Sequence, residues 1–307
     1  MILACAFLAG SAWLTIHEYH FARRLIQAID IRQNADYRVA AELSQRFAGR
    51  RVMAAGAVGY VLNVDSDTPQ FYGGHEQFNP NRMNRIALYQ IDTGDGAGSQ
   101  DGDICVLWLK AFGVHAVNVA APASAEHYKP FRRNPAIFDP LLPVEYHAGS
   151  ETIYRVPQRT AGLAHVVPET ALIVTPPRDG LDVAAVRGYV AALDDETLPP
   201  AEYKQTSLRA AHIHARLGPG QVVSVQTNYN AGWRASIAGE AQPIASDGLG
   251  MLVIRPRLQG DCDIDLVFKG GLELAITRWI SGLTALALAL VVVFTGRRAA
   301  EDLVPDR

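Results

Sequence analysis

Two histidines with one residue between them are the first candidates for chemistry in this 307-residue chain. His212 and His214 fall in a segment that we expect to be a strand, where residues two apart point to the same face. Such a pair suits zinc, and His165 would complete a ligand set only if the fold brings it close. Solvent-facing positions on a half-buried strand also explain the pattern, and we favour that interpretation.

Aspartates provide a second candidate site. Asp261, Asp263 and Asp265 alternate in the same way, and carboxylates suit calcium outside a cell. The acidic face of an edge strand that avoids aggregation explains them as well. The polar loop at residues 92–103 lacks the spacing and the final glutamate of a calcium-binding loop. We therefore assign no metal to either segment.

The sequence lacks the motifs of the common enzyme classes. It has no Gly-x-Ser-x-Gly elbow, no His-Glu-x-x-His, no phosphate-binding loop and no dinucleotide-binding glycine pattern. A net charge of −3 argues against a nucleic-acid partner. The three cysteines fall in unrelated segments and indicate no disulfide framework. From the residues alone we assign no catalytic residue and no cofactor.

An apolar segment near the carboxyl end decides how the chain is anchored. Residues 279–295 contain no ionisable side chain and would span roughly 26 Å as a helix, close to the thickness of a bilayer core. Arg297 and Arg298 follow at once, so the positive-inside rule predicts a cytoplasmic tail at residues 297–307. We expect a transmembrane helix over residues 272–296, with the bulk of the chain extracytoplasmic.

The amino end is apolar too. Residues 1–16 form an uncharged segment that ends before His17. A secretory signal peptide is one explanation, but the segment lacks a basic start and a small-x-small cleavage site. We interpret it as a transmembrane helix cut short by a truncated reading frame.

Composition predicts a folded body between these apolar ends. The chain is 49% hydrophobic and 19% charged, which is too apolar for disorder and too polar for many spans. Helical periodicity at residues 36–48, then Gly49 and an apolar run at residues 51–57, predicts an α/β region over residues 30–143. Short apolar runs separated by turns predict a β-sandwich over residues 144–270. The expected class is α+β, with a small α/β subdomain followed by a jelly-roll-like sandwich.

Three further elements are expected within that body. Residues 105–112 have the apolar character of a buried helix, which Gly113 would stop. Residues 114–119 alternate like a strand. Asp182 is a suitable N-cap for a helix whose apolar face starts with Val183.

Several short segments together resemble one family of membrane proteins. They cover a region from Asp36 to the end of the chain, and they are residues 108–110 (WLK), 113–114 (GV), 153–156 (IYRV), 163–167 (LAHVV), 229–235 (YNAGWRA), 238–240 (AGE) and 245–249 (ASDGL). The last three are similar to a hairpin near the carboxyl end of YfhO-type bacterial membrane proteins. The apolar helix after the hairpin is where that family has one.

YfhO-type proteins are polytopic and are similar to the C-type (GT-C) glycosyltransferases, which use lipid-linked sugars. The resemblance implies an extracytoplasmic, carboxyl-terminal part of such a protein in the bacterial cytoplasmic membrane. It would assist sugar transfer from a lipid-linked donor during cell-envelope glycan synthesis, with membrane lipid and a lipid-linked sugar or glycan as partners. The early spans that carry the acidic residues of the GT-C class are missing from this sequence, so no catalytic residue is carried over.

The resembling hairpin supplies the only binding residues that we nominate, Tyr229 and Trp233. Gly232 permits a bend, and Trp233 offers an apolar plug for the sandwich or, alternatively, an exposed ring for a sugar. The rival function is a non-catalytic, membrane-anchored module that binds a saccharide or a protein. A third is a metal-dependent hydrolase that uses His212, His214 and an aspartate.

Overall fold

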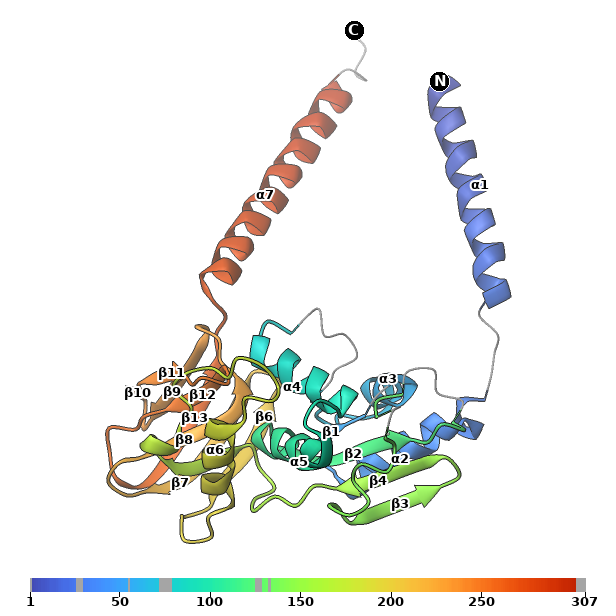
Figure 1. The fold of residues 1–307 in the computed structure, drawn as a ribbon. Helices are drawn as coiled ribbons and strands as arrows, with labels where there is room; N and C mark the ends of the chain where they lie inside the picture. The colour runs from blue at the N-terminus through green and yellow to red at the C-terminus, as the bar shows by residue number, and fades with distance from the viewer. Residues whose placement is uncertain are drawn as a thin grey trace, which may run out of the picture.

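Two long helices leave the body of the protein on the same side (Figure 1). The computed structural model describes residues 2–25, 30–54, 56–71, 79–124, 129–131 and 134–301. The long helices are α1 (Ile2–Leu25) and α7 (Leu272–Glu301), and the chain ends lie at their far tips (Figure 1). Residues 302–307, the larger part of the predicted cytoplasmic tail, fall outside this description.

The first region of the body is a four-stranded sheet with helices on both faces. Its strand order is β1-β2-β4-β3, with β1 parallel to β2 and the other pairs antiparallel. The strands are β1 (Arg51–Met53), β2 (Val114–Ala120), β3 (Val144–Ala148) and β4 (Glu151–Arg155). The helices are α2 (Ala35–Arg46), α3 (Gly56–Asp65), α4 (Arg82–Thr93) and α5 (Asp101–Ala111), with short 3-10 turns at Ile31–Gln33 and Gly98–Gln100.

Helix α2 shows how the sequence specifies this region. The Asn34 side chain accepts a hydrogen bond from the Asp36 amide at 3.1 Å and so satisfies one of the free N–H groups at the helix start. Val39, Leu43 and Phe47 follow at intervals of four and are buried against α3 and the sheet. Helices α4 and α5 cover the opposite face.

The second region is a sandwich of two antiparallel sheets. One sheet has the order β10-β9-β13-β7-β6 and the other β11-β12-β8-β5. Their bounds are β5 (Ala164–Pro168), β6 (Ala201–Ser207), β7 (Ala210–Leu217), β8 (Gln221–Asn228), β9 (Trp233–Ile237), β10 (Glu240–Gln242), β11 (Ile244–Ser246), β12 (Met251–Ile254) and β13 (Gly260–Phe268). A 3-10 turn, Glu169–Ala171, and helix α6 (Ala184–Asp194) lie between β5 and β6.

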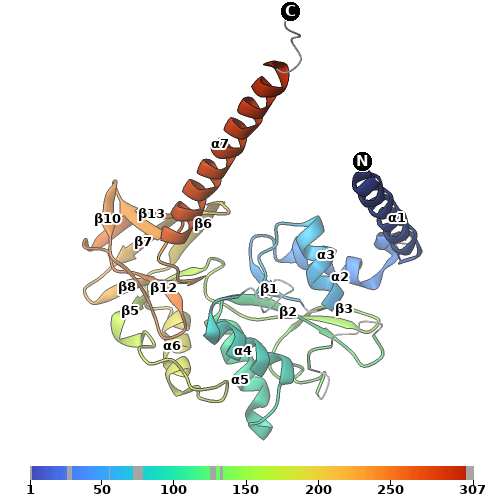
Figure 2. The same ribbon diagram turned by 90° about the horizontal axis from the view of Figure 1, so that it is seen from above.

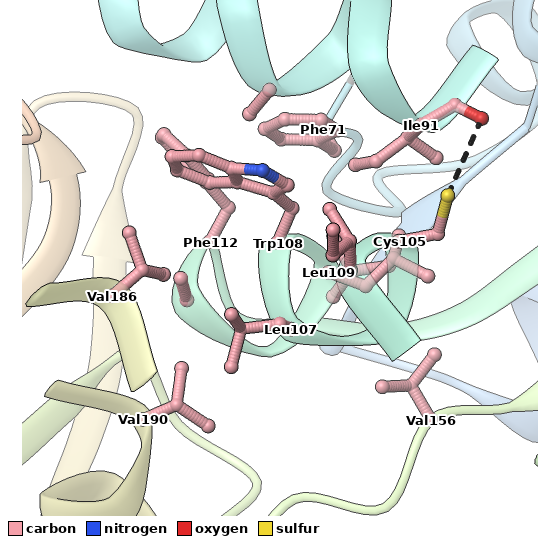
Figure 3. Close-up of a cluster of buried hydrophobic side chains, with 14 of the residues drawn as sticks. Phe71, Ile91, Cys105, Leu107, Trp108, Leu109, Phe112, Val156, Val186 and Val190 are labelled. Carbon is pink, nitrogen blue, oxygen red and sulfur yellow. Dashed lines mark hydrogen bonds between the residues drawn. The ribbon is translucent and has the colours of Figure 1, made fainter. Parts of the chain in front are cut away.

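One hydrophobic core runs through both regions. Trp108 of α5 and Phe112, the residue that follows α5, belong to the same buried cluster as Val186 and Val190 of α6 (Figure 3). The Tyr189 hydroxyl lies 2.8 Å from the Ser224 hydroxyl and fixes α6 to the four-stranded sheet of the sandwich. The sandwich and the first sheet lie side by side when seen from above (Figure 2). The two regions therefore form one body.

The predicted α+β class is confirmed, as are the helices at residues 36–48 and 105–112 and the strand at 114–119. The sandwich was expected to begin at residue 144, but β3 and β4 pair with β2 in the first sheet, and its first strand begins at Ala164. Short apolar strands carry no signal for which sheet they join, because their partners are distant in the sequence.

Two local predictions are also corrected. The apolar run at 51–57 is not one strand, since β1 ends at Met53 and α3 begins at Gly56. Asp182 does not cap α6. Its carboxylate accepts hydrogen bonds from the Arg178 backbone and side chain at 3.1 and 3.0 Å. Helix α6 begins at Ala184, and the residue at its N-cap position, Val183, provides no side-chain cap.

Within the described part of the chain, Leu272–Val292 is the one stretch identified as long and apolar enough to cross a membrane. None of it is buried in the body, and Trp279, Leu283 and Leu286 are exposed. Helix α1 also exposes large apolar side chains, including Trp13 and Leu14.

A buried polar junction joins the two regions where α5 ends. Arg51 of β1 donates from Nη1 to the carbonyl oxygens of Phe112 and Gln226, both at 2.7 Å. The Gln226 side chain of β8 donates from Nε2 to the carbonyls of Lys110 and Ala111 at 2.9 and 3.0 Å. The last carbonyls of α5 are therefore satisfied by side chains of two different sheets.

Two buried histidines lie in or beside this junction. The Nε2 atom of His165 is 3.0 Å from the Gln226 Oε1, which requires that Nε2 carry the hydrogen. Burial lowers the pKa of His165 to about 4. Burial, followed by the charge of Arg50, lowers the pKa of His115 on β2 to about 4 as well. Both side chains are neutral in the folded protein at pH 7.

We expect the body to lose stability as the pH falls from about 6.5 to about 4. Histidines of the unfolded chain titrate near 6.5, so over this interval the unfolded state binds protons that the folded state does not. The loss is about 3 kcal/mol per histidine at most. Thermal melting of the full chain in detergent at pH 7 and pH 4.5 measures it.

His165→Gln should reduce the difference in melting temperature between the two pH values. His147→Gln, at an exposed histidine, is the matched control and should leave the difference unchanged. Equal melting temperatures at both pH values in the unmodified protein would contradict the expectation.

Candidate functional site

The structure does not bring the three candidate histidines together. His212 and His214 lie on the exposed face of β7, whereas His165 is buried in the other sheet of the sandwich. The Nδ1 atom of His212 lies 3.1 Å from Asp265 Oδ1, and that of His214 lies 2.8 Å from Asp263 Oδ1. These are cross-strand pairs between β7 and β13. The hydrogen bond to Asp263 raises the pKa of His214.

The described residues contain no group of three or more histidines, cysteines or acids arranged to hold a metal. The hydrolase hypothesis therefore has no metal centre among them. The edge-strand interpretation of the aspartates is wrong, because β13 lies between β9 and β7 inside its sheet. Asp263 and Asp265 lie opposite histidines, and Asp261 lies opposite Arg216. Cross-strand charge pairing accounts for the alternation.

Of the two nominated binding residues, Trp233 lies next to Phe268, at the end of the strand that leads into α7. The Trp233 ring is half-buried and packs edge-on against Phe268, with ring centroids 5.3 Å apart. Tyr229 is also half-buried, and its backbone amide donates to the Gly250 carbonyl at 2.9 Å. Trp233 is therefore packed against the sandwich core and is also partly exposed.

Gly232 allows the hairpin to touch the chain just before α7. The Lys269 amide donates to the Gly232 carbonyl at 2.9 Å. A Cβ at Gly232 would lie 2.6 Å from both the carbonyl carbon of Gly270 and Cε2 of Phe268. No side chain fits there, so the close contact requires glycine.

We expect Gly232→Ala to destabilise the full chain by about 1 to 3 kcal/mol, because the methyl group would force the hairpin away from Gly270. Gly188→Ala is the matched control. That position lies inside α6 with nothing within 4 Å of the added Cβ, so alanine there should stabilise by about 0.5 to 1 kcal/mol. Thermal melting in detergent compares the two, and equal effects would contradict the packing argument.

An open hollow of about 580 Å³ lies between α4 and the loop that precedes α6. Helix α4 contributes Arg82, Arg85 and Tyr89, whose spacing places them on one exposed face. The loop contributes Arg178 and Asp179. We call these residues, with Ile86 and Gly180, the arginine hollow.

Asn81 fixes the start of α4 against the sandwich. Its Oδ1 accepts from the Met83 amide at 2.9 Å, which caps the helix. Its Nδ2 donates to the Leu249 carbonyl and to Asn228 Oδ1, both at 2.9 Å. The same side chain thus begins the helix and binds it to the ends of β8 and the β11–β12 turn.

The loop that forms the opposite wall of the hollow is held in place by contacts with α5 and α4. The indole N–H of Trp108 donates to the Gly180 carbonyl at 2.8 Å. A Cβ at Gly180 would lie 2.5 Å from Cβ of Gln90. The loop therefore approaches α4 more closely than a residue with a side chain would allow. Asp179 accepts from the amides of Leu181 and Asp182 at 2.9 and 3.0 Å, which closes the turn.

The electrostatics of the hollow favour an anion. Arg178 forms a 3.0 Å ion pair with Asp182, and the Arg178 hydrogen bonds lower the pKa of that carboxyl. Arg82 and Arg85 form no ion pair with any described residue. Guanidinium groups bind phosphate oxygens in pairs of parallel hydrogen bonds. The ring of Tyr89, 70% exposed, offers an apolar face beside them.

Sequence reasoning missed this site. Arg82 and Arg178 are distant in the chain, and nothing local predicts their meeting. One signal was present: Arg82, Arg85 and Tyr89 alternate with the buried Met83 and Ala87 at helical spacing.

Comparison with protein families, with curated proteins and with solved structures found no match. The resemblance to YfhO-type proteins therefore rests on the short segments quoted for it and stays a hypothesis.

Proposed function

We propose that this chain is the extracytoplasmic, carboxyl-terminal part of a YfhO-like membrane protein and that its arginine hollow binds the phosphate of a lipid-linked sugar. The catalytic groups of the sugar transfer would lie outside this chain. The observation that carries the proposal is the pair Arg82 and Arg85, exposed and without an ion-pair partner among the described residues, facing Arg178 across an open hollow.

The position of the hollow supports a ligand that is held in a bilayer. Helix α4 lies on the side of the body from which α1 and α7 leave (Figure 1). Asn81 contacts Asn228 at the end of β8, and the hairpin after β8 contacts the base of α7. With α7 inserted, this arrangement would place the start of α4 on the side of the body that faces the bilayer (Figure 1).

The chemistry of the hollow matches the two parts of such a ligand. Two guanidinium groups would bind a phosphate or diphosphate, and the exposed Tyr89 ring would stack on the attached sugar. The rival function, a saccharide-binding module without catalysis, requires the aromatic ring but not the arginines. Dependence of binding on phosphate therefore separates the two.

The arginines can be tested with the full chain in nanodiscs. Farnesyl phosphate is the probe, and phosphate-free farnesol is the matched ligand. We expect Arg82→Gln together with Arg85→Gln to weaken farnesyl phosphate binding at least about tenfold in calorimetric titration, since hydrogen bonds to charged groups contribute about 1.5 to 3 kcal/mol each. Arg257→Gln removes an exposed arginine between β12 and β13 and should leave the affinity unchanged.

Equal binding by the unmodified protein and the double variant, or equal binding of farnesyl phosphate and farnesol, would contradict the assignment of a phosphate site. Binding of a free sugar that survives loss of both arginines would favour the saccharide-binding module.

The proposed orientation makes a separate prediction. Protease added outside intact spheroplasts should cut the exposed stretch at residues 98–100 and should spare a tag placed after Arg307. Immunoblotting of the tag and of the released body measures both. Destruction of the tag without lysis would show that the carboxyl end faces outward.

A further inference from the structure

We infer that the sandwich touches the membrane with a defined surface, which we call the α7 rim: Leu208, Arg209, Arg234 and Lys269. The ligand of this surface is the layer of anionic lipid headgroups of the bilayer that α7 crosses. The inference rests on the insertion of α7 in the proposed function, and it is independent of the arginine hollow.

Two turns of the sandwich surround the chain where it enters α7. The Phe268 amide donates to the Arg209 carbonyl at 2.7 Å, which places the β6–β7 turn beside the end of β13. On the other side, the Lys269 amide donates to the Gly232 carbonyl at 2.9 Å. Helix α7 begins at Leu272, so both turns lie within a few residues of the apolar helix.

The apolar residue of the rim lies at the tip of the β6–β7 turn. Leu208 is 95% exposed and is absent from the three buried hydrophobic clusters. An exposed leucine with cations beside it is the pattern of surfaces that lie in the membrane interface. Its neighbour Arg209 is exposed as well.

The start of the apolar stretch places the rim at headgroup depth. The stretch that is long and apolar enough to cross a membrane begins at Leu272. A headgroup layer roughly 5 to 8 Å thick adjoins the hydrocarbon on each side of a bilayer. The two turns of the rim are bonded to the chain at Phe268 and Lys269, immediately before Leu272, and so lie at the depth of this layer.

The charges of the rim suit anionic lipids. Arg209, Arg234 and Lys269 are exposed around the base of α7. Glu273 is a carboxylate in the first turn of α7, and Asp265 on β13 pairs with His212. Cations close to a membrane surface are attracted to anionic headgroups.

A fluorescent probe at the tip can test the contact in the full chain. Leu208→Cys in a Cys5→Ser background gives one accessible thiol, since Cys105 and Cys262 are buried. The labelled protein is reconstituted in vesicles of phosphatidylcholine and phosphatidylglycerol that carry a headgroup spin label. The control is Leu258→Cys, at an exposed leucine before β13 and so at the opposite end of a nine-residue strand, roughly 30 Å away.

We expect the spin label to quench the probe at position 208 at least threefold more strongly than the probe at position 258. Arg209→Glu should reduce the quenching at position 208 about twofold, whereas Arg257→Glu, the same charge change at the distal end, should not. Vesicles without phosphatidylglycerol should also reduce the quenching at position 208 about twofold.

Equal quenching at both positions, in chains that resist alkaline extraction from the vesicles, would overturn the inference. A probe at position 208 that becomes shielded from water without being quenched by the lipid label would also overturn it, since a protein would then cover the tip. Extraction of the chain by alkali would overturn both the inserted α7 and the rim. Loss of farnesyl phosphate binding alone would affect only the arginine hollow.

Discussion

The carbonyl groups at the end of α5 need hydrogen-bond donors, and two side chains from elsewhere in the chain supply them. Arg51 reaches the Phe112 carbonyl from the first sheet, and Gln226 reaches the Lys110 and Ala111 carbonyls from the sandwich. Gly113 follows with φ of 67°, so the chain can turn into β2 directly beneath these contacts. A helix end that would otherwise be buried without partners thus joins two sheets. The continuous core around Trp108 depends on this arrangement.

The arginine hollow depends on the same frame. Trp108 and Gln90 hold the loop that carries Arg178, while Asn81 begins α4 against the sandwich. The cations themselves are exposed, but the elements beneath them are fixed by buried contacts. A site of this kind keeps its shape without a ligand, which reduces the ordering needed when an anion binds.

Local sequence patterns predicted what local physics determines. The apolar spacing at residues 36–48 marked α2, Gly113 marked the end of α5, and the uncharged run at residues 279–295 marked the part of α7 that is long and apolar enough to cross a membrane. Contacts between segments that are distant in the sequence could not be predicted from such local patterns. Strands β3 and β4 look like sandwich strands and join the first sheet, and the approach of Arg178 to Arg82 follows only from the assembled core. Aspartate often caps helices, but the carboxylate of Asp182 accepts a hydrogen bond from the Arg178 guanidinium instead of capping α6.

The contact between Gly232 and Gly270 has a mechanical consequence. With no side chain on either residue, the hairpin and the strand end meet backbone to backbone, and Gly270 adopts a φ of 83° that steers the chain into α7. The hydrogen bond between the Lys269 amide and the Gly232 carbonyl ties the start of α7 to the hairpin. A change in the tilt of α7 would therefore be passed through this contact to the sandwich, and from the sandwich to the start of α4, which Asn81 binds to Asn228 at the end of β8.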